Sequence, residues 1–200
     1  MDEIWDVAVI GSGIVGTCAA YHAAKKGLKT INIEQFTFGH SKGSSHGKSR
    51  ILEHVHEHAD FIPIVVDSKK QIEEMGKRKG EKLFTKTGLL WLTVNGDHEQ
   101  LTDTMDLSGS KYEVLTGSEV SARFPIFSYD DTWMGVLDVE AGVLNADRCL
   151  KAFHEEFLAL GGRFMDNCEV STFDDGNVVT VHTSNGVVSA RHLIVAPVRT

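Results

Sequence analysis

The chain has 200 residues, 42% of them hydrophobic and 24% charged, which is enough for one ordinary globular domain or a large domain with a smaller lobe. A formal net charge of −8 argues against a broad nucleic-acid-binding surface, and no apolar run approaches the roughly 20 residues of a membrane span. The acidic opening Met-Asp-Glu-Ile-Trp-Asp does not resemble a signal peptide, and the three cysteines are far apart, so we expect an intracellular protein without disulfides or a zinc site.

The first 34 residues predict a strand–helix–strand unit. Residues 6–10 form a short continuous apolar run, which is typical of a parallel strand buried on both faces. A glycine bend covers residues 11–16, an alanine-rich helix follows over about 15–26, and a second strand covers 30–34. These elements make a complete βαβ unit.

The rest of the chain predicts many strands and a few helices. We expect a polar loop over 39–47, an extended stretch over 51–58, a helix over 61–78, a strand over 83–94, a short helix over 97–105, and a capping box at 116–119 opening a helix that stops before Pro125. We then expect one or two strands over 133–143, a helix from Asn145 to Leu160, and strands over 163–168, 170–173, 178–183 and 187–195. This order predicts an α/β fold in which a Rossmann-like βαβ domain carries an inserted second sheet.

The glycine bend has the spacing of a dinucleotide-binding motif. Gly11, Gly13 and Gly16 follow a buried strand and open a helix, which is the context that the motif requires. The first permits the tight turn, the second lets a pyrophosphate approach the backbone, and the third allows the helix to pack closely on the strand. The helix start, with Ile14 and Val15, would hold the phosphate charge on its amides and its positive dipole end.

Glu34 ends the second predicted strand, 18 positions after Gly16. A carboxylate there can accept hydrogen bonds from ribose hydroxyls and would repel a 2′-phosphate, so NADP is disfavoured. The first 34 residues alone would equally allow an NAD-dependent dehydrogenase.

A second glycine-rich loop favours a flavin. The run Gly-Ser-Ser-His-Gly-Lys-Ser-Arg brings hydrogen-bond donors at Ser44, Ser45, His46 and Arg50, suited to a pyrophosphate or to the electron-rich side of a flavin. NAD enzymes do not normally need such a set of donors. Following the glycine bend and its acid, this run resembles the monomeric and peroxisomal sarcosine oxidases, which belong to the glycine-oxidase and D-amino-acid-oxidase group. Shorter matches at 84–90, 140–144 and 193–195 extend the resemblance over nearly the whole chain, as the N-terminal portion of a longer protein.

The resemblance implies an FAD domain made from residues 1–82 and 145–200, with residues 83–144 as part of a substrate lobe. It implies oxidation of the C–N bond of a secondary amine, an N-methyl amino acid such as sarcosine, or an imino acid such as pipecolate, with O2 reduced to H2O2. By matching positions, FAD would be contacted by Gly11, Gly13, Gly16, Glu34, Ser45, His46 and Arg50. Arg50 would be the cation beside the flavin ring, and the Val170 backbone would contact adenine. A peroxisomal location would follow from the family, with the cytoplasm as the alternative.

The chain departs from the family at three points. Glu53 stands where the family has a second arginine for the substrate carboxylate, so we expect a neutral or cationic amine, or no turnover of amino acids. The final Val-Ala-Pro-Val-Arg-Thr lacks the usual glycine turn, and no cysteine matches the one that binds flavin covalently. The alternative is therefore a truncated, inactive isoform that retains a nucleotide-binding fold. The sequence leaves the oligomeric state open.

His54, His56 and His58 alternate, as ligands on one face of a strand would. A carboxylate or cysteine placed to complete a metal site is not apparent, so we expect a solvated or pocket-lining strand instead.

Overall fold

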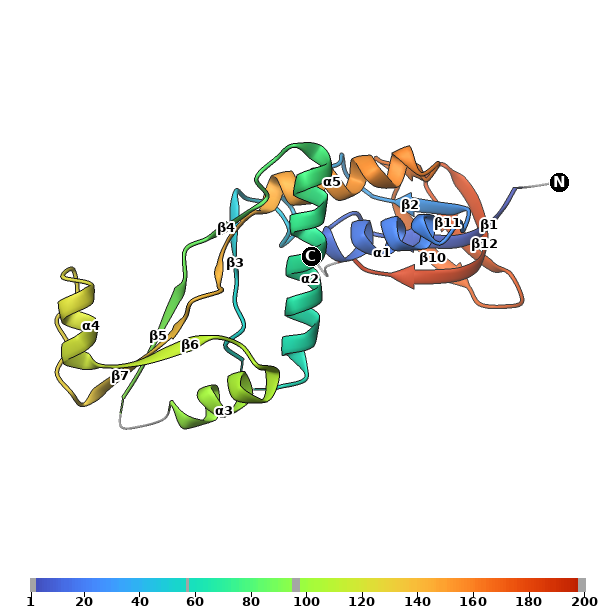
Figure 1. The fold of residues 1–200 in the computed structure, drawn as a ribbon. Coiled ribbons are helices and arrows are strands. Elements are labelled where there is room, and N and C mark those ends of the chain that lie inside the picture. Colours follow the sequence, from blue (N-terminus) through green and yellow to red (C-terminus); the bar gives the residue numbers. More distant parts are fainter. Residues whose placement is uncertain (1–2, 57, 95–97, 198–200) are drawn as a thin grey trace. The chain divides into compact units, whose positions relative to one another are not determined.

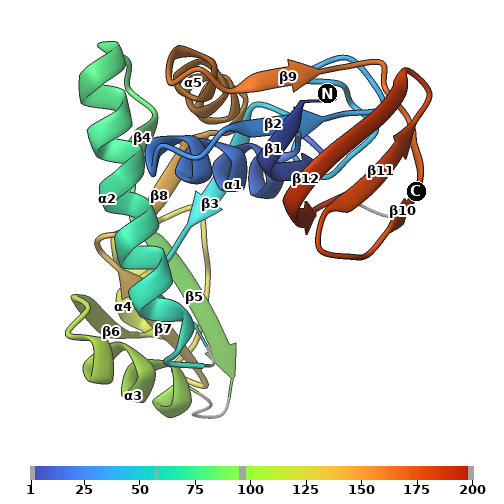
Figure 2. The same cartoon turned by 90° about the vertical axis from the view of Figure 1, so that its right-hand side faces the viewer.

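The computed structural model describes residues 3–56, 58–94 and 98–197. The chain forms two compact units, which we call the first unit (residues up to 48 and from 146 onward) and the second unit (49–145). Figures 1 and 2 give two views of their helices and strands. Parts of three predicted segments lie outside the described residues. They are Asp97, where the helix predicted over 97–105 begins, Glu57, within the extended stretch predicted over 51–58, and residues 198–200 of the final segment.

The first unit is built on a six-stranded sheet with the order β10-β11-β12-β1-β2-β9. Its strands are β1 (Ile4–Ile10), β2 (Thr30–Ile33), β9 (Arg163–Met165), β10 (Val170–Asp174), β11 (Val179–Thr183) and β12 (Gly186–Val195). The central strand β1 pairs in parallel with β12 on one side and β2 on the other, and β9 continues the parallel part. This arrangement confirms the predicted α/β fold with a parallel βαβ start.

Two helices of the first unit pack on each other, α1 (Ile14–Lys25) and α5 (Ala146–Ala159). Small residues on α1, including Ala20 and Ala24, are buried, and they allow the helices to approach closely. The ring of Tyr21 meets the ring of Phe153 edge to face, with centroids 5.3 Å apart. Because α1 also contacts β1 and β2, its start is held at the end of the opening strand.

The same two helices carry thiols, for which we expect low reactivity. Burial and the nearby Cys149 raise the pKa of Cys18 to about 12, and burial and Asp147 raise the pKa of Cys149 to about 11. Since the thiolate is the nucleophile, both thiols should react with iodoacetamide at pH 8 at least about 100-fold more slowly in the folded chain than in urea. Peptide mapping after timed labelling would check this, and equal rates in both states would contradict the helix packing.

The second unit contains two three-stranded antiparallel sheets, with the orders β3-β8-β4 and β5-β7-β6. Its elements are β3 (Ser49–Leu52), α2 (Phe61–Lys79), β4 (Phe84–Lys86), β5 (Leu89–Val94), α3 (Glu99–Ser108), β6 (Tyr112–Thr116), α4 (Gly117–Arg123), β7 (Trp133–Asp138) and β8 (Gly142–Asn145). Val55, Leu101, Met105 and Val136 form a core cluster in this unit. The capping box is confirmed, since Thr116 accepts from the Glu119 amide and Glu119 from the Thr116 amide.

The prediction of one strand over 83–94 is wrong. The chain breaks between β4 and β5, which belong to different sheets. Gly88 adopts a φ of 73°, in the left-handed region that favours glycine, and the amides of Thr87 and Gly88 both donate to the Ala141 carbonyl. These bonds direct the chain from one sheet to the next.

The extended stretch predicted over 51–58 is also shorter than expected. β3 ends at Leu52, and the His54 amide donates to the Asp138 carboxylate at 2.6 Å instead of to a strand. His56 stacks on the ring of Phe61, with centroids 4.9 Å apart. Within the described residues, no three His, Cys, Asp or Glu side chains gather as a metal site would require.

The second unit begins at Ser49, upstream of the domain boundary expected at residue 83. The reason is that β3 pairs with β8, and α2 packs near β4, so residues 49–82 associate with the inserted sheets. The role of these sheets as a substrate lobe stays a prediction.

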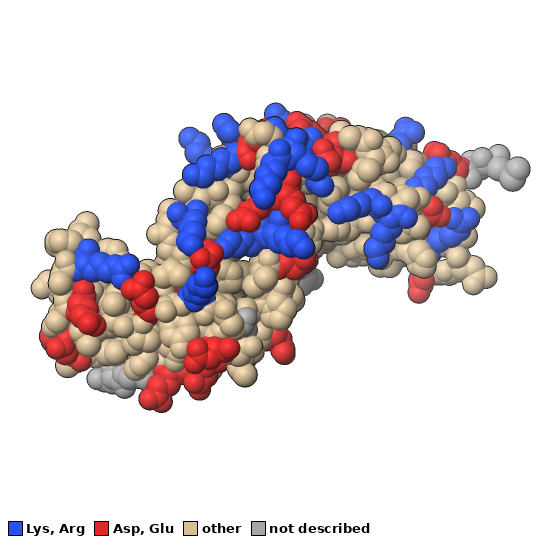
Figure 3. Space-filling model, in the orientation of Figure 1, with Lys and Arg blue, Asp and Glu red and all other residues tan. Residues whose placement is uncertain are grey.

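Lys and Arg side chains are interspersed with Asp and Glu on the face of the described residues drawn in Figure 3. Among the described helices, none is both long enough and apolar enough to cross a membrane.

Candidate functional site

The glycine bend closes tightly at the end of β1. Gly11 has a φ of +98°, and a Cβ there would lie 2.7 Å from the Ala196 carbonyl oxygen. A Cβ on Gly16 would lie 2.0 Å from the Gly11 carbonyl oxygen, far inside van der Waals contact. The bend therefore requires glycine at both positions, one for its backbone conformation and one for the close approach of α1.

The start of α1 is capped from the second glycine-rich loop. Gly13 is the N-cap residue and brings no side chain, and the first turn carries no acidic residue. The Ile14 amide donates to Ser45 Oγ at 2.9 Å, and a Cβ on Gly13 would approach the same oxygen to 3.0 Å. A helix N-terminus that has no acidic residue in its first turn and faces glycine backbone is a favourable place for an anion.

Glu34 lies beside the bend and is 5% exposed. Its Oε2 accepts hydrogen bonds from the Ser12 amide at 2.8 Å and from the Ser12 hydroxyl at 3.1 Å. Its Oε1 accepts from the Phe36 amide at 3.0 Å. These three donors satisfy the buried carboxyl group at the end of β2.

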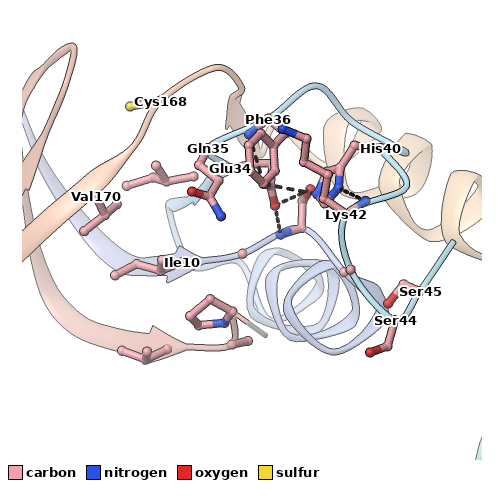
Figure 4. A pocket seen from close by; sticks show the side chains of 18 of the residues that line it. Ile10, Glu34, Gln35, Phe36, His40, Lys42, Ser44, Ser45, Cys168 and Val170 are labelled. Atoms are coloured by element: carbon pink, nitrogen blue, oxygen red, sulfur yellow. Dashed lines mark hydrogen bonds and ion pairs between the residues drawn. The ribbon is translucent and has the colours of Figure 1, made fainter. Parts of the chain in front are cut away.

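The bend, Glu34 and the glycine-rich loop share a cavity of about 420 Å³ within the first unit. Figure 4 shows the labelled side chains around it, with Glu34 near His40 and Lys42, and Val170 on the opposite side. The volume falls within the roughly 300–1,000 Å³ of small-molecule sites. Apolar groups from Ile10 and Val170 line the cavity together with the polar ones, as an amphipathic ligand with a charged and an apolar part would need.

Most of the predicted contact residues meet at this cavity. Those that line it are Gly11, Gly13, Glu34, Ser44, Ser45, His46 and Val170. Gly16 packs behind the bend, the Ile14 amide is held by Ser45, and the Val15 side chain is 68% exposed away from the lining. His46 Nδ1 contacts the Gly43 carbonyl and thereby stabilises the turn of the loop.

Arg50 belongs to the second unit, on β3, where its guanidinium donates to the Ser49 carbonyl at 2.6 Å. Its predicted position beside a flavin ring stays a prediction. Glu53 follows on the same segment, and its Oε2 accepts a hydrogen bond from the Trp91 indole at 3.1 Å. The indole holds the Glu53 carboxylate beside an aromatic ring, and this arrangement suits a cation better than an anion.

Sequence reasoning missed several residues that line the cavity, namely Ser12, Phe36, His40, Lys42, Ala196 and Pro197. Ser12 occupies a variable position of the motif, so the pattern carries no signal for it. The chain after β12 returns to the bend because the Ala196 amide donates to the Ile10 carbonyl at 2.8 Å. The sequence does contain an indication of Ala196 and Pro197, because they stand where the family has a glycine turn.

The residues present fit the adenosine-diphosphate part of a dinucleotide. Side chains are excluded from the bend by Gly11 and Gly13, the helix end favours the diphosphate, and the carboxylate at the strand end suits a ribose. This fit is shared by FAD and NAD, since both carry that part.

Comparison with known proteins identifies the family that the chain resembles. Residues 6–197 match the family model described as FAD dependent oxidoreductase, DAO. The chain is 42% identical over 97% of its length to a putative sarcosine oxidase of Caenorhabditis elegans, covering 51% of that protein. It is 34% identical over 96% of its length to the human peroxisomal sarcosine oxidase, covering 50% of it. The chain thus spans about half the length of the curated relatives it matches.

Solved structures agree in fold. NikD, described as an unusual amino acid oxidase essential for nikkomycin biosynthesis, superposes with a TM-score of 0.83 at 23% identity, over 98% of this chain and 51% of that one. The L-proline dehydrogenase from P. horikoshii gives a TM-score of 0.84 at 20% identity, over 98% of this chain and 53% of that one.

Proposed function

The chain belongs to the DAO family of FAD-dependent oxidoreductases, and from this premise we propose that its first unit binds FAD. The observation that carries the proposal is the meeting of the glycine bend, the α1 start and Glu34 at one cavity. When bound, FAD supplies the electron acceptor for amine oxidation. The chain's own residues would hold its diphosphate at the glycine bend and the positive end of α1, and its ribose at Glu34.

We propose further that the whole protein oxidises the C–N bond of a secondary amine, N-methyl amino acid or imino acid, and that O2 becomes H2O2. The names of the relatives support this, since they include sarcosine oxidases and N-methyl-L-tryptophan oxidases. Glu53 and Trp91 favour a substrate that is cationic or neutral at that point rather than a carboxylate. An intracellular, peroxisomal or cytoplasmic location goes with this proposal, because the human and mouse relatives are named peroxisomal.

The test is the flavin affinity of the 200-residue chain and of its Glu34→Gln variant. The wild-type chain should bind FAD more tightly than NAD and keep a flavin absorbance spectrum after desalting. Glu34→Gln should weaken FAD binding by about 10- to 100-fold, because the charged acceptor for the ribose is lost. Isothermal titration would measure both affinities.

The matched control is Glu3→Gln, which neutralises an exposed carboxylate of the first unit that pairs with Lys29. It should leave FAD affinity unchanged. Preference for NAD would restore the dehydrogenase alternative. FAD binding without peroxide release on sarcosine, pipecolate, proline or a secondary amine lacking a carboxylate would favour the inactive nucleotide-binding alternative.

A further inference from the structure

The segment after β2 folds back over the Glu34 carboxylate. The His40 ring meets the ring of Phe36 edge to face, with centroids 4.8 Å apart. The Lys42 ammonium lies 4.2 Å from the centroid of the Phe36 ring, and the Lys42 amide donates to His40 Nδ1 at 3.0 Å. Figure 4 shows these side chains grouped at Glu34, at the edge of the cavity. Phe36, His40 and Lys42 therefore act as a single packed group, which holds the imidazole in a defined orientation.

That orientation directs His40 Nε2 toward Glu34. Because Nδ1 accepts from the Lys42 amide, Nε2 carries the proton in the neutral ring, and it lies 3.3 Å from Glu34 Oε1. An ionised carboxylate offers about four acceptor positions. The Ser12 amide, the Ser12 hydroxyl and the Phe36 amide take three of them. The remaining acceptor position is on Oε1, the oxygen that His40 Nε2 faces.

Ribose recognition by Glu34 needs at least one of these positions. The two backbone donors are fixed by the bend and by the end of β2, and Ser12 is 3% exposed. The His40 side chain is 19% exposed and lies on the wall of the cavity. Of the groups around the carboxylate, His40 is therefore the one that can move away at the lowest cost in free energy.

We propose that His40 is a specificity-determining residue that competes with the ribose hydroxyls for Glu34, and that it must leave Oε1 when a nucleotide binds. The proposal rests on the proposed function, since it concerns the same nucleotide site. Without a nucleotide, His40 Nε2 stays beside Oε1 of the buried carboxylate. With a nucleotide, the ribose replaces it, so a ligand without ribose hydroxyls cannot make the exchange.

The experiment measures ADP and 2′,3′-dideoxy-ADP affinity by isothermal titration for the wild-type chain, His40→Phe and His40→Gln. His40→Phe keeps an aromatic ring against Phe36 but removes the Nε2 donor, and it should tighten ADP binding by about three- to tenfold. Its affinity for the dideoxy nucleotide should equal that of the wild type. His40→Gln retains a donor on a side chain of similar reach and should restore an affinity close to that of the wild type.

Thr37→Ala serves as the control for an altered loop, since Thr37 is exposed in the same segment and should leave both affinities unchanged. Unchanged or weaker ADP binding by His40→Phe would overturn the role of His40 and leave the nucleotide site standing. Tightening of both nucleotides alike would also overturn it, because the effect would then not depend on the ribose. If neither the wild type nor any variant bound ADP, the proposed function would fall, and the role of His40 with it.

Discussion

Replacing Gly16 with valine should lower the free energy of unfolding by about 3 kcal/mol or more and abolish FAD binding. Already the first carbon of the new side chain would lie 2.0 Å from the Gly11 carbonyl oxygen and 2.9 Å from its carbonyl carbon. Both atoms belong to the backbone of the bend, so neither can move aside as a flexible side chain would. The start of α1 must then shift away from β1, and the amides that face the cavity shift with it.

Two measurements separate the parts of this effect. Urea unfolding followed by circular dichroism reports the stability, and titration with FAD at low urea reports the site. Gly176→Ala is the matched control, since a Cβ there meets its nearest neighbour, the Val178 carbonyl oxygen, at an ordinary 3.5 Å. A Gly16→Val chain with the stability and FAD affinity of the wild type would contradict the packing of helix on bend.

The bend was predictable from sequence because its causes are local. An apolar run, three glycines at fixed spacing and an alanine-rich stretch each favour the observed conformation within a few residues. The helix start, the two strands and the placement of Glu34 at the strand end follow from the same pattern. The predicted loop residues Ser45 and His46 reached the cavity for a related reason, since the loop leaves the sheet at the edge where the bend lies.

What the sequence could not show depends on partners far along the chain. Trp5 pairs with Ala190 across β1 and β12, and no local pattern identifies that partner. The strand break at Gly88 has the same origin, because the amides that define it bond to Ala141, in a segment that is distant in sequence. The apolar run over 83–94 looks continuous when it is considered alone, although tertiary pairing divides it between two sheets.

The residues that surround the Glu34 carboxylate could not be predicted from the sequence, for a chemical reason. Ser12, Phe36 and His40 are ordinary loop residues, and their roles arise from a buried carboxylate that needs donors.

Strand β6 was missed because its residues 112–116 are exposed or half-buried, so the alternation of apolar and polar residues is weak. Its pairing with β7 makes it a strand.

A buried carboxylate in the second unit leads to the other large expected effect. Asp138 is fully buried and accepts hydrogen bonds from the His54 amide at 2.6 Å, from the His54 ring at 3.1 Å, and from the amides of Glu140 and Ala141 at 3.0 Å each. These bonds hold the segment after β3 and the turn between β7 and β8 at the same point. Asp138→Ala should lower the free energy of unfolding by about 3–5 kcal/mol, because several buried donors lose their acceptor.

The exposed pair of Asp174 and His182 provides the matched control. Its ring nitrogen and carboxylate oxygen lie 2.7 Å apart, with the Asp174 side chain 73% exposed. Since exposed ion pairs contribute about 0–1 kcal/mol, Asp174→Ala should change stability little. If both variants lost the same free energy of unfolding, the burial of Asp138 would not be the cause of the destabilisation.

The effect of Asp138 should also depend on pH, with a sign that its pKa determines. Burial alone would raise the pKa of Asp138, but the hydrogen bonds from the ring and backbone of His54 outweigh it and hold the pKa below its ordinary value. The folded chain then binds this proton less readily than the unfolded chain. The carboxylate therefore contributes its full stabilisation above the unfolded pKa of about 3.9, and loses it as the pH falls through the lower folded value. The free energies of unfolding of the wild type and Asp138→Ala, measured in urea, should differ most at pH 6–7 and converge in acid. A difference that widened below pH 4 would contradict a lowered pKa for Asp138.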